Sequence, residues 1–201
     1  MAVSALRPDV LSGVTVLLAG GETAAIAGHL KALGARTATL EPAGLRDEEA
    51  VGAAVDAAPL PDVLVVDGAG LFAAAGAGHD GLRGCVDETW NAVRAVADRR
   101  WIDRAQAGAG HRGKVVLLAP APGAGLHAGP ARAALENVAR TLSTEWARYA
   151  ITTVAVLPGD DTDPHEVHEL VAFVASPAGD YLTGCAFTLG QIAGSLRSSS
   201  R

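Results

Sequence analysis

The chain has 201 residues and a formal net charge of −6, and this length is enough for one domain with a sizeable core. The negative charge and the lack of any Lys/Arg cluster argue against a nucleic-acid partner, because a phosphate backbone would be repelled. Apolar residues make up 49% of the chain, as in globular proteins, but no apolar run reaches the roughly 20 residues of a membrane span, so we expect no membrane partner.

The two cysteines and the N-terminal segment indicate in which cellular compartment the protein is expected. Cys85 and Cys185 belong to no Cys-x-x-Cys or Cys/His spacing, so we expect free thiols in a reducing environment. The opening MAVSALRPDV lacks the basic and apolar regions of a signal peptide. Together these features predict a cytoplasmic protein.

The first half of the chain alternates between predicted strands and helices. In chain order we expect a strand, a helix, a strand, a helix and a strand at 14–18, 23–33, 36–40, 47–57 and 63–66. The nearly continuous apolar run of the last strand is typical of a strand covered on both faces. The next segment, 72–84, is rich in Ala and Gly and predicts a loop or a frayed helix.

The second half continues the alternation, beginning with a helix and ending with a strand: 85–105, 114–118, 130–149, 151–157, 166–175 and 186–189. Pro130 suits the first turn of its helix, where the missing N–H is not needed. This order predicts an α/β fold with a doubly wound, Rossmann-like parallel sheet in a single domain, 1–194. We expect the polar remainder, 195–201, to be a disordered tail.

Three segments are similar to one known family. RAALENVARTLSTEWARYAITTVAVLPG, Arg132–Gly159, resembles the helix and strand that follow the active-site tyrosine of the short-chain dehydrogenase/reductase (SDR) family. ELVAFVASPAGDYLTG, Glu169–Gly184, resembles the family's C-terminal segment, and PDVLVVDGAG, Pro61–Gly70, resembles its strand ending in Asn-Asn-Ala-Gly. From Val14 to about Gln191 the chain therefore resembles the 3-oxoacyl reductase-like SDR members, which implies their fold.

The resemblance implies that the catalytic positions are vacated. In this family a Tyr-x-x-x-Lys pair transfers the proton, a serine orients the substrate carbonyl and an asparagine supports a proton relay. Aligned on the shared helix, the tyrosine position falls on Ala128 and the lysine position on Arg132. The serine position falls at Ala119-Pro120, and the asparagine position falls near Cys85.

No neighbouring residue replaces these groups by the family's mechanism. Ala128 cannot donate a proton, and Tyr149 lies too far along the same helix. His127, next to the vacated position, is an alternative acid, although a loop histidine is more often simply solvated. We therefore expect the chain to contain no catalytic residues.

The predicted nucleotide turn is also altered. The resemblance implies Thr-Gly-x-x-x-Gly-x-Gly, whereas residues 19–24 read AGGETA, which is about two residues short. Glu22 would stand where the anion lies and would repel it. Gly20, Gly21 and Glu41, the last at the position that binds ribose hydroxyls in NAD-binding proteins, keep NAD(P) binding open as an alternative, but we expect no tightly bound cofactor.

The substrate lid of the family is shortened here. Only Asp160–His165 separates the Pro158-Gly159 pair from the last predicted helix, so a bound substrate would not be shielded from water. The acidic run with His165 and His168 allows a metal site, but such runs beside a helix start more often cap the helix, and we expect no metal.

The assembly helices of the family are retained. The resemblance implies that the helices at about 85–105 and 130–149 pack against the same helices of a neighbour, with the last strand and final helix as a second contact. Trp90 and Trp101 lie on the first of these helices and are either interface anchors or residues that cover the sheet.

These observations favour a non-catalytic SDR-like subunit, a pseudoenzyme that assembles with an active SDR ketoreductase or dehydrogenase as a hetero-oligomer. One alternative is an NAD(P)-dependent SDR oxidoreductase that uses His127 and Arg132. A second alternative is a homo-oligomeric scaffold or a ligand sensor that uses the vacant cleft.

Overall fold

The computed structural model describes residues 6–21, 23–76, 78–109 and 112–190. In these residues six parallel strands form one sheet in the order β2-β1-β3-β4-β5-β6. The strands are β1 (Thr15–Gly20), β2 (Arg36–Leu40), β3 (Val63–Asp67), β4 (Gly113–Leu118), β5 (Ile151–Leu157) and β6 (Cys185–Thr188). The predicted single-domain α/β fold with a doubly wound parallel sheet is confirmed.

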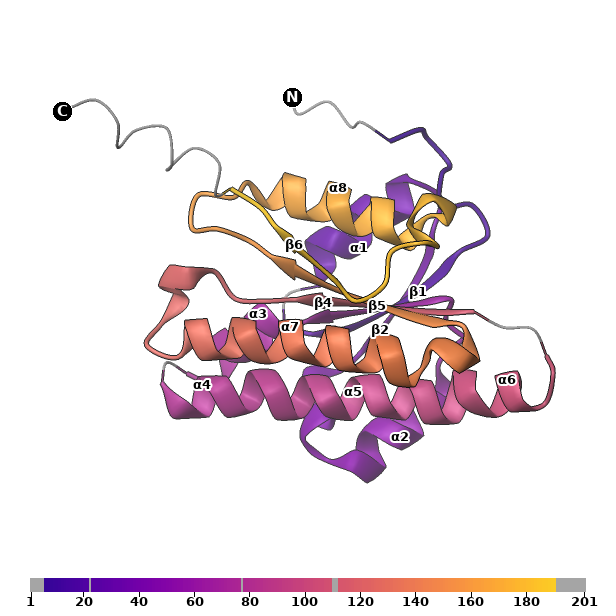
Figure 1. Cartoon of the computed structure of the whole chain (residues 1–201), viewed down its shortest axis with the longest axis horizontal. Coiled ribbons are helices and arrows are strands. Elements are labelled where there is room, and N and C mark those ends of the chain that lie inside the picture. The colour runs from indigo at the N-terminus through magenta and orange to yellow at the C-terminus, as the bar shows by residue number, and fades with distance from the viewer. Residues whose placement is uncertain (1–5, 22, 77, 110–111, 191–201) are drawn as a thin grey trace.

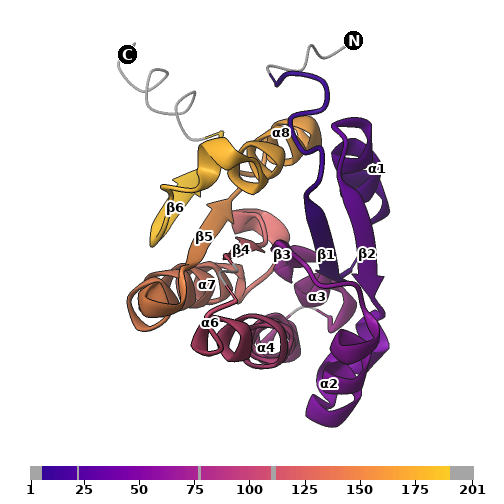
Figure 2. The same ribbon diagram turned by 90° about the vertical axis from the view of Figure 1, so that its right-hand side faces the viewer.

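Helices cover both faces of this sheet (Figures 1 and 2). One face carries α1 (Ala24–Ala32) and α8 (Pro164–Ala175). The other face carries α2 (Glu48–Ala57), α3 (Gly68–Ala74), α4 (His79–Arg83), α5 (Thr89–Val96), α6 (Asp103–Gln106) and α7 (Ala128–Glu145). The turns Gly84–Glu88 and Ala97–Ile102 are π-helical and join α4, α5 and α6 into one helical run that lies beside α7 (Figure 1).

The sheet separates two hydrophobic cores. Alternate residues of β3 serve both: Val63 and Val65 face α1 and α8, whereas Leu64 and Val66 face the opposite helices. All four side chains are fully buried, which explains the continuous apolar run in the sequence. Among the described residues, none of the helices has both the length and the apolar character that a membrane span requires.

Two helix predictions need correction. The segment expected to be loop or frayed helix, 72–84, contains the end of α3 and all of α4, so the long helical run begins at His79. Ala and Gly give little periodic signal, whereas the structure shows the Asp67 carboxylate capping α3 by accepting the Gly70 N–H at 2.9 Å. The helix expected to reach residue 149 ends at Glu145 and is followed by a 3-10 turn.

The sheet is one strand short on the β2 side. A doubly wound dinucleotide-binding sheet has the order 3-2-1-4-5-6, with two strands beyond the first. Here β2 is the edge strand, and the chain passes from it through the 3-10 turn at 42–46 and α2 directly to β3. The half of the fold that begins with the turn after β1 therefore has one strand fewer than a dinucleotide-binding sheet, which the sequence did not predict.

The short connection before the last helix is present as expected. Residues 160–163 alone separate Gly159 from the first residue of α8, so no lid helix stands at this place. The predicted disordered tail, 195–201, lies outside the described residues.

Candidate active site

A cleft of about 310 Å³ lies beyond the carboxyl ends of β1, β3, β4 and β5, where doubly wound folds bind their ligands. Its lining is mostly apolar, and it includes residues of both α1 and α8. The ionisable side chains that line it are Asp67, Asp160 and His168. Among the described residues of the lining, these two carboxylates and one imidazole are the groups that could act as an acid or a base near neutral pH.

The position aligned with the family's tyrosine is closed. Ala128 is the first residue of α7 and is fully buried, and its N–H donates to the Gly125 carbonyl at 3.1 Å. Ala128 is not among the residues that line the cleft. A proton donor at this position is therefore absent, and the space that its side chain would need is filled.

Arg132, at the lysine position, joins the ends of two strands. Its Nη1 atom lies 2.6 Å from the carbonyl oxygen of Pro120, after β4, and 2.6 Å from that of Pro158, after β5. Burial lowers the pKa of Arg132, and Asp160 opposes this shift. A guanidinium keeps its charge under such a shift, so Arg132 is a cation held by two backbone carbonyls.

The serine and asparagine positions carry no polar group toward a substrate. Ala119 lines the cleft but has no hydroxyl, and Pro120 is buried beside it. Cys85 is fully buried, and burial, with a smaller contribution from Asp67, raises its thiol pKa to about 12. A thiol with such a pKa stays protonated and unreactive at neutral pH.

The alternative acids lie elsewhere. The His127 ring meets the His79 ring of α4 edge-on, with centroids 6.4 Å apart, and does not line the cleft. Tyr149 lies beyond the end of α7 with the Arg148 guanidinium over its ring, and Tyr181 is 92% exposed. Neither of the chain's two tyrosines reaches the cleft.

Gly20 and Gly21 are required by contacts within the chain. Gly20 has φ +109°, and a Cβ atom on it would stand 2.6 Å from the Asp67 carbonyl oxygen. A Cβ atom on Gly21 would stand 2.5 Å from the Gly70 Cα atom. The turn therefore lies directly against the junction of β3 and α3, so its glycines do not need a nucleotide to explain them.

The charge of the cleft disfavours phosphate. Two carboxylates line the cleft: Asp67, which caps α3, and Asp160, which accepts the Gly123 N–H at 2.6 Å. No Lys or Arg is among the described residues that line it. Glu41 is exposed at the end of β2 and outside this lining, and Glu22 lies outside the described residues.

Comparison with known proteins rests on structure, because no family model and no curated protein matches the sequence. BdcA (YjgI) from E. coli is 22% identical over 90% of this chain and 100% of that chain, with a TM-score of 0.66. A short chain dehydrogenase from Mycobacterium avium is 18% identical over 90% of this chain and 83% of that chain, with a TM-score of 0.73. This chain has the fold of the short-chain dehydrogenases.

A cofactor complex is known for one protein of this short-chain dehydrogenase fold. BdcA has been solved in complex with NADPH, and that structure is 20% identical over 89% of this chain and 93% of that chain, with a TM-score of 0.65. At this identity the likeness carries the fold and not the activity. The chemistry available to this chain must therefore be argued from the side chains that line its cleft.

The two tryptophans differ in their surroundings. Trp101 is 1% exposed, and its Nε1 atom donates to the Pro61 carbonyl at 2.7 Å, so it covers the sheet and is excluded as a surface anchor. Trp90 on α5 is 39% exposed. Of the two predicted interface residues, Trp90 alone lies at the surface of the short-chain dehydrogenase fold described here.

His168 is a cleft residue that the sequence did not predict at this place. It follows the first residue of α8, Pro164, by one helical turn, and both residues line the cleft together with Val167. Burial lowers the pKa of His168 first, then His29 and His165, while Asp163 opposes the shift. The sequence did hold one signal for this position: the connection between Gly159 and α8 is short, so the first turns of α8, including His168, lie close to the end of β5.

Proposed function

We propose that this chain is a non-catalytic subunit of the short-chain dehydrogenase fold that assembles with an active ketoreductase or dehydrogenase of the same fold. The observation that carries the proposal is the bridge made by Arg132. At the position of the family's catalytic lysine, this cation is bound to the carbonyls of Pro120 and Pro158. With Ala128 buried at the tyrosine position, the pair that transfers the proton is replaced by a structural contact.

The cleft offers no substitute for that pair. Carbonyl reduction needs an acid beside the carbonyl oxygen and a site for a phosphate-bearing hydride donor. The ionisable cleft residues are two aspartates, which repel phosphate, and His168, whose lowered pKa favours the neutral imidazole. This charge distribution supports a role that does not include turnover.

Two exposed surfaces support assembly. The first is the face of α5 and α7, where Trp90 stands 39% exposed, and the second is the face of α8 and β6, where Phe173 is 38% exposed. Within the described sheet β6 is an edge strand, so its outer side pairs with no other strand. These are the surfaces that the family resemblance assigns to subunit contacts, and exposed aromatic residues are typical of interface centres.

Co-expression tests this proposal. The chain is produced with a tagged reductase encoded next to it, and the purified mixture is analysed by size exclusion with light scattering. We expect one complex at micromolar concentration, and we expect Trp90→Arg to weaken it roughly 30-fold, the effect of a hot-spot residue worth about 2 kcal/mol. Leu126→Arg is the matched control, because Leu126 is 84% exposed but belongs to the loop before α7 and not to α5, α7, α8 or β6.

The mass of each eluted species, measured by light scattering, distinguishes this proposal from the alternative functions. Two separate peaks for the wild-type chain and the reductase would contradict the proposal. A homodimer of this chain that ignores the reductase would favour the scaffold or sensor alternative. A complex that Trp90→Arg leaves intact would move the contact from α5 to the surface of α8 and β6.

The second candidate is an NAD(P)-dependent reductase with atypical residues. The open cleft favours it, as does the NADPH complex of BdcA, a protein of similar fold. Its test is the loss of NADPH absorbance when the pure chain meets a panel of ketones and β-ketoacyl thioesters. Turnover that disappears in His127→Ala or Arg132→Met would establish this candidate.

A further inference from the structure

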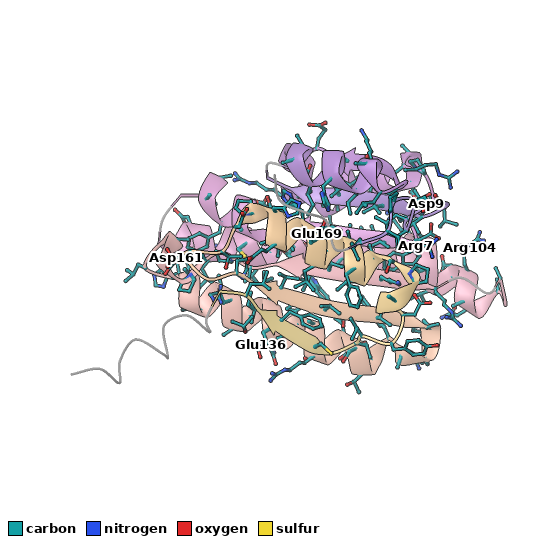
Figure 3. All side chains as sticks on the ribbon, turned by 90° about the horizontal axis from the view of Figure 1, so that it is seen from above. Arg7, Asp9, Arg104, Glu136, Asp161 and Glu169 are labelled. Carbon is teal, nitrogen blue, oxygen red and sulfur yellow. The ribbon has the colours of Figure 1, made fainter. Side chains whose placement is uncertain are left out.

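Three imidazoles and one carboxylate gather between α1 and α8, on the sheet face opposite α5 and α7. His29 lies on α1, and His165, His168 and Glu169 lie on α8. Figure 3 looks down on this face, with α1 and α8 side by side and Glu169 labelled on α8. None of these residues has a role in the assembly proposed above.

The local structure explains why these groups meet. Residues three and four positions apart share one face of a helix, so His165, His168 and Glu169 project from α8 on the same side. The apolar residues of α1 and α8, including Leu30 and Val171, are buried in one hydrophobic cluster that holds the helices together. This contact brings the side chain of His29 to that face of α8.

The distances suit a shared ion. The His29 Nε2 atom lies 3.1 Å from Glu169 Oε1, and the His165 Nε2 atom lies 3.9 Å from the same oxygen. One potential ligand atom from each of the three residues lies within 4.8 Å of the others. Tetrahedral zinc with nitrogen and oxygen ligands at about 2.0–2.2 Å places neighbouring ligand atoms about 3.4 Å apart. Small rotations of the side chains close the group on one ion.

The contact between His29 and Glu169 is not a directed hydrogen bond. Although the two atoms are close, the His29 Nε2 atom is buried and makes no hydrogen bond among the described residues. The side chains are only 15% and 16% exposed. A buried polar nitrogen without a hydrogen bond is rare in folded proteins, and an ion between the two groups would use its lone pair.

We propose that His29, His165 and Glu169 bind a divalent transition-metal ion, with zinc as the best match. Two imidazoles and one carboxylate are a typical zinc ligand set, whereas magnesium and calcium prefer oxygen ligands alone. His168, whose ring centroid is 5.9 Å from that of His29, or a water molecule completes the coordination. The ion joins α1 to α8 and fixes two walls of the cleft, which both helices line.

Metal titration of the full chain tests this site. The protein is stripped with a chelator, carries no histidine tag, and is titrated with Zn²⁺ by calorimetry and with Co²⁺ by visible absorption. We expect one ion per chain with a Kd below about 10 µM. His29→Ala and Glu169→Gln should each weaken binding at least about 100-fold, more than the loss of an outer-shell partner does. His79→Ala and His127→Ala, which alter the other histidine pair, are the matched controls and should bind normally.

A measurement on the unmutated chain covers the case in which a variant fails to fold. X-ray absorption of the zinc-loaded protein should show two or three imidazole ligands and no sulfur, and zinc should raise the melting temperature in a way that a chelator reverses. Sulfur ligation, a Kd above about 100 µM, or unchanged binding in folded His29→Ala and Glu169→Gln would overturn the proposal. These outcomes are independent of whether a partner reductase binds.

Discussion

The two ends of strand β4 are each held by a cation bound to backbone carbonyls. At the amino end, the Lys114 Nζ atom donates to the carbonyls of Val174, Ala175 and Ser176, at the end of α8, and forms an ion pair with Asp180 at 2.6 Å. At the carboxyl end, Arg132 binds the carbonyls that follow β4 and β5. Doubly wound folds place their ligands at the carboxyl end.

This comparison bears on the proposed non-catalytic role of the chain. Lys114 is a structural residue, because its side chain is 11% exposed, it neutralises Asp180 and it satisfies the last carbonyls of a helix. Arg132 makes the same kind of contact at the position where the family resemblance places a catalytic lysine. The carboxyl end of β4 is therefore held by the same kind of contact as the amino end, which agrees with the proposed role without turnover.

The largest loss of stability is expected from a substitution at the amino end of β4. Lys114→Met removes the ion pair and the hydrogen bonds to α8, and it leaves Asp180 without its nearest cation, so the free energy of unfolding should fall by about 3 kcal/mol. Urea denaturation measures the change. Lys31→Met is the control, because Lys31 is exposed and its loss should change stability by less than about 0.5 kcal/mol. Equal effects for the two lysines would contradict a structural role for Lys114.

The glycine turn offers a sharper test of the carboxyl end. Gly21→Ala places a Cβ atom 2.5 Å from the Gly70 Cα atom, so it should destabilise the chain by about 2 kcal/mol without any nucleotide present. Gly28→Ala, in α1 with no atom within 4 Å of its added Cβ, should stabilise it by about 0.5–1 kcal/mol. A Gly21→Ala variant as stable as the wild type would mean that this glycine serves a bound ligand and not the fold.

Arg132→Met is expected to have a smaller effect. It leaves the carbonyls of Pro120 and Pro158 without their donor at a half-buried site, so the free energy of unfolding should fall by about 1–2 kcal/mol. Arg140→Met is the control on the same helix, because its exposed ion pair with Glu136 contributes only about 0.3–0.5 kcal/mol. If the urea midpoint of Arg132→Met equals that of the wild type, the contacts of Arg132 with the two carbonyls do not stabilise the fold.

The smallest expected effect is on the pH dependence of the free energy of unfolding, and it depends on the burial of Cys85. Because burial raises the pKa of Cys85 from 9.0 to about 12, the folded thiol keeps its proton while the unfolded one loses it. The stability from this group is present below pH 9 and is lost as the pH rises from 9 toward 12. Cys85→Ser, which does not ionise in this range, should show a flatter stability curve above pH 9.

Labelling of the native chain checks the same burial of Cys85. Iodoacetamide at pH 8 should modify half-buried Cys185 and spare Cys85 until the chain unfolds, as read by mass spectrometry. Rapid native modification of Cys85 would show that the cleft opens at the position aligned with the family's asparagine.

The sequence predicted the parts of the fold that depend on local pattern. Strands 36–40 and 151–157 were placed at their observed limits, because runs of apolar and β-branched residues between turn residues leave little choice. The short connection at 160–163 was also predicted, since it depends on residue spacing, whereas the vacated catalytic positions stay a prediction that follows from the family resemblance. The helix over 79–83 was missed because its five residues, HDGLR, contain one large apolar side chain and therefore no apolar stripe.

What the sequence could not predict depends on tertiary contacts. The two carbonyl partners of Arg132 come from Pro120 and Pro158, far apart in the chain, and the meeting of His29 with Glu169 depends on how α1 packs beside α8. The burial of Trp101 under Pro61 is a further example. Each of these contacts joins segments whose relative position no local pattern specifies.

Calorimetric titration of the pure, isolated chain with NADPH and NADH measures whether this cleft binds a nicotinamide nucleotide. The part of the chain that the structure describes lines the cleft with two aspartates and no cation, and the sheet has only one strand beyond β1 in the nucleotide-binding half. We therefore predict no saturable binding at concentrations up to about 1 mM. Binding of either nucleotide with a Kd below about 100 µM, lost in Gly21→Ala but not in Gly28→Ala, would contradict the account.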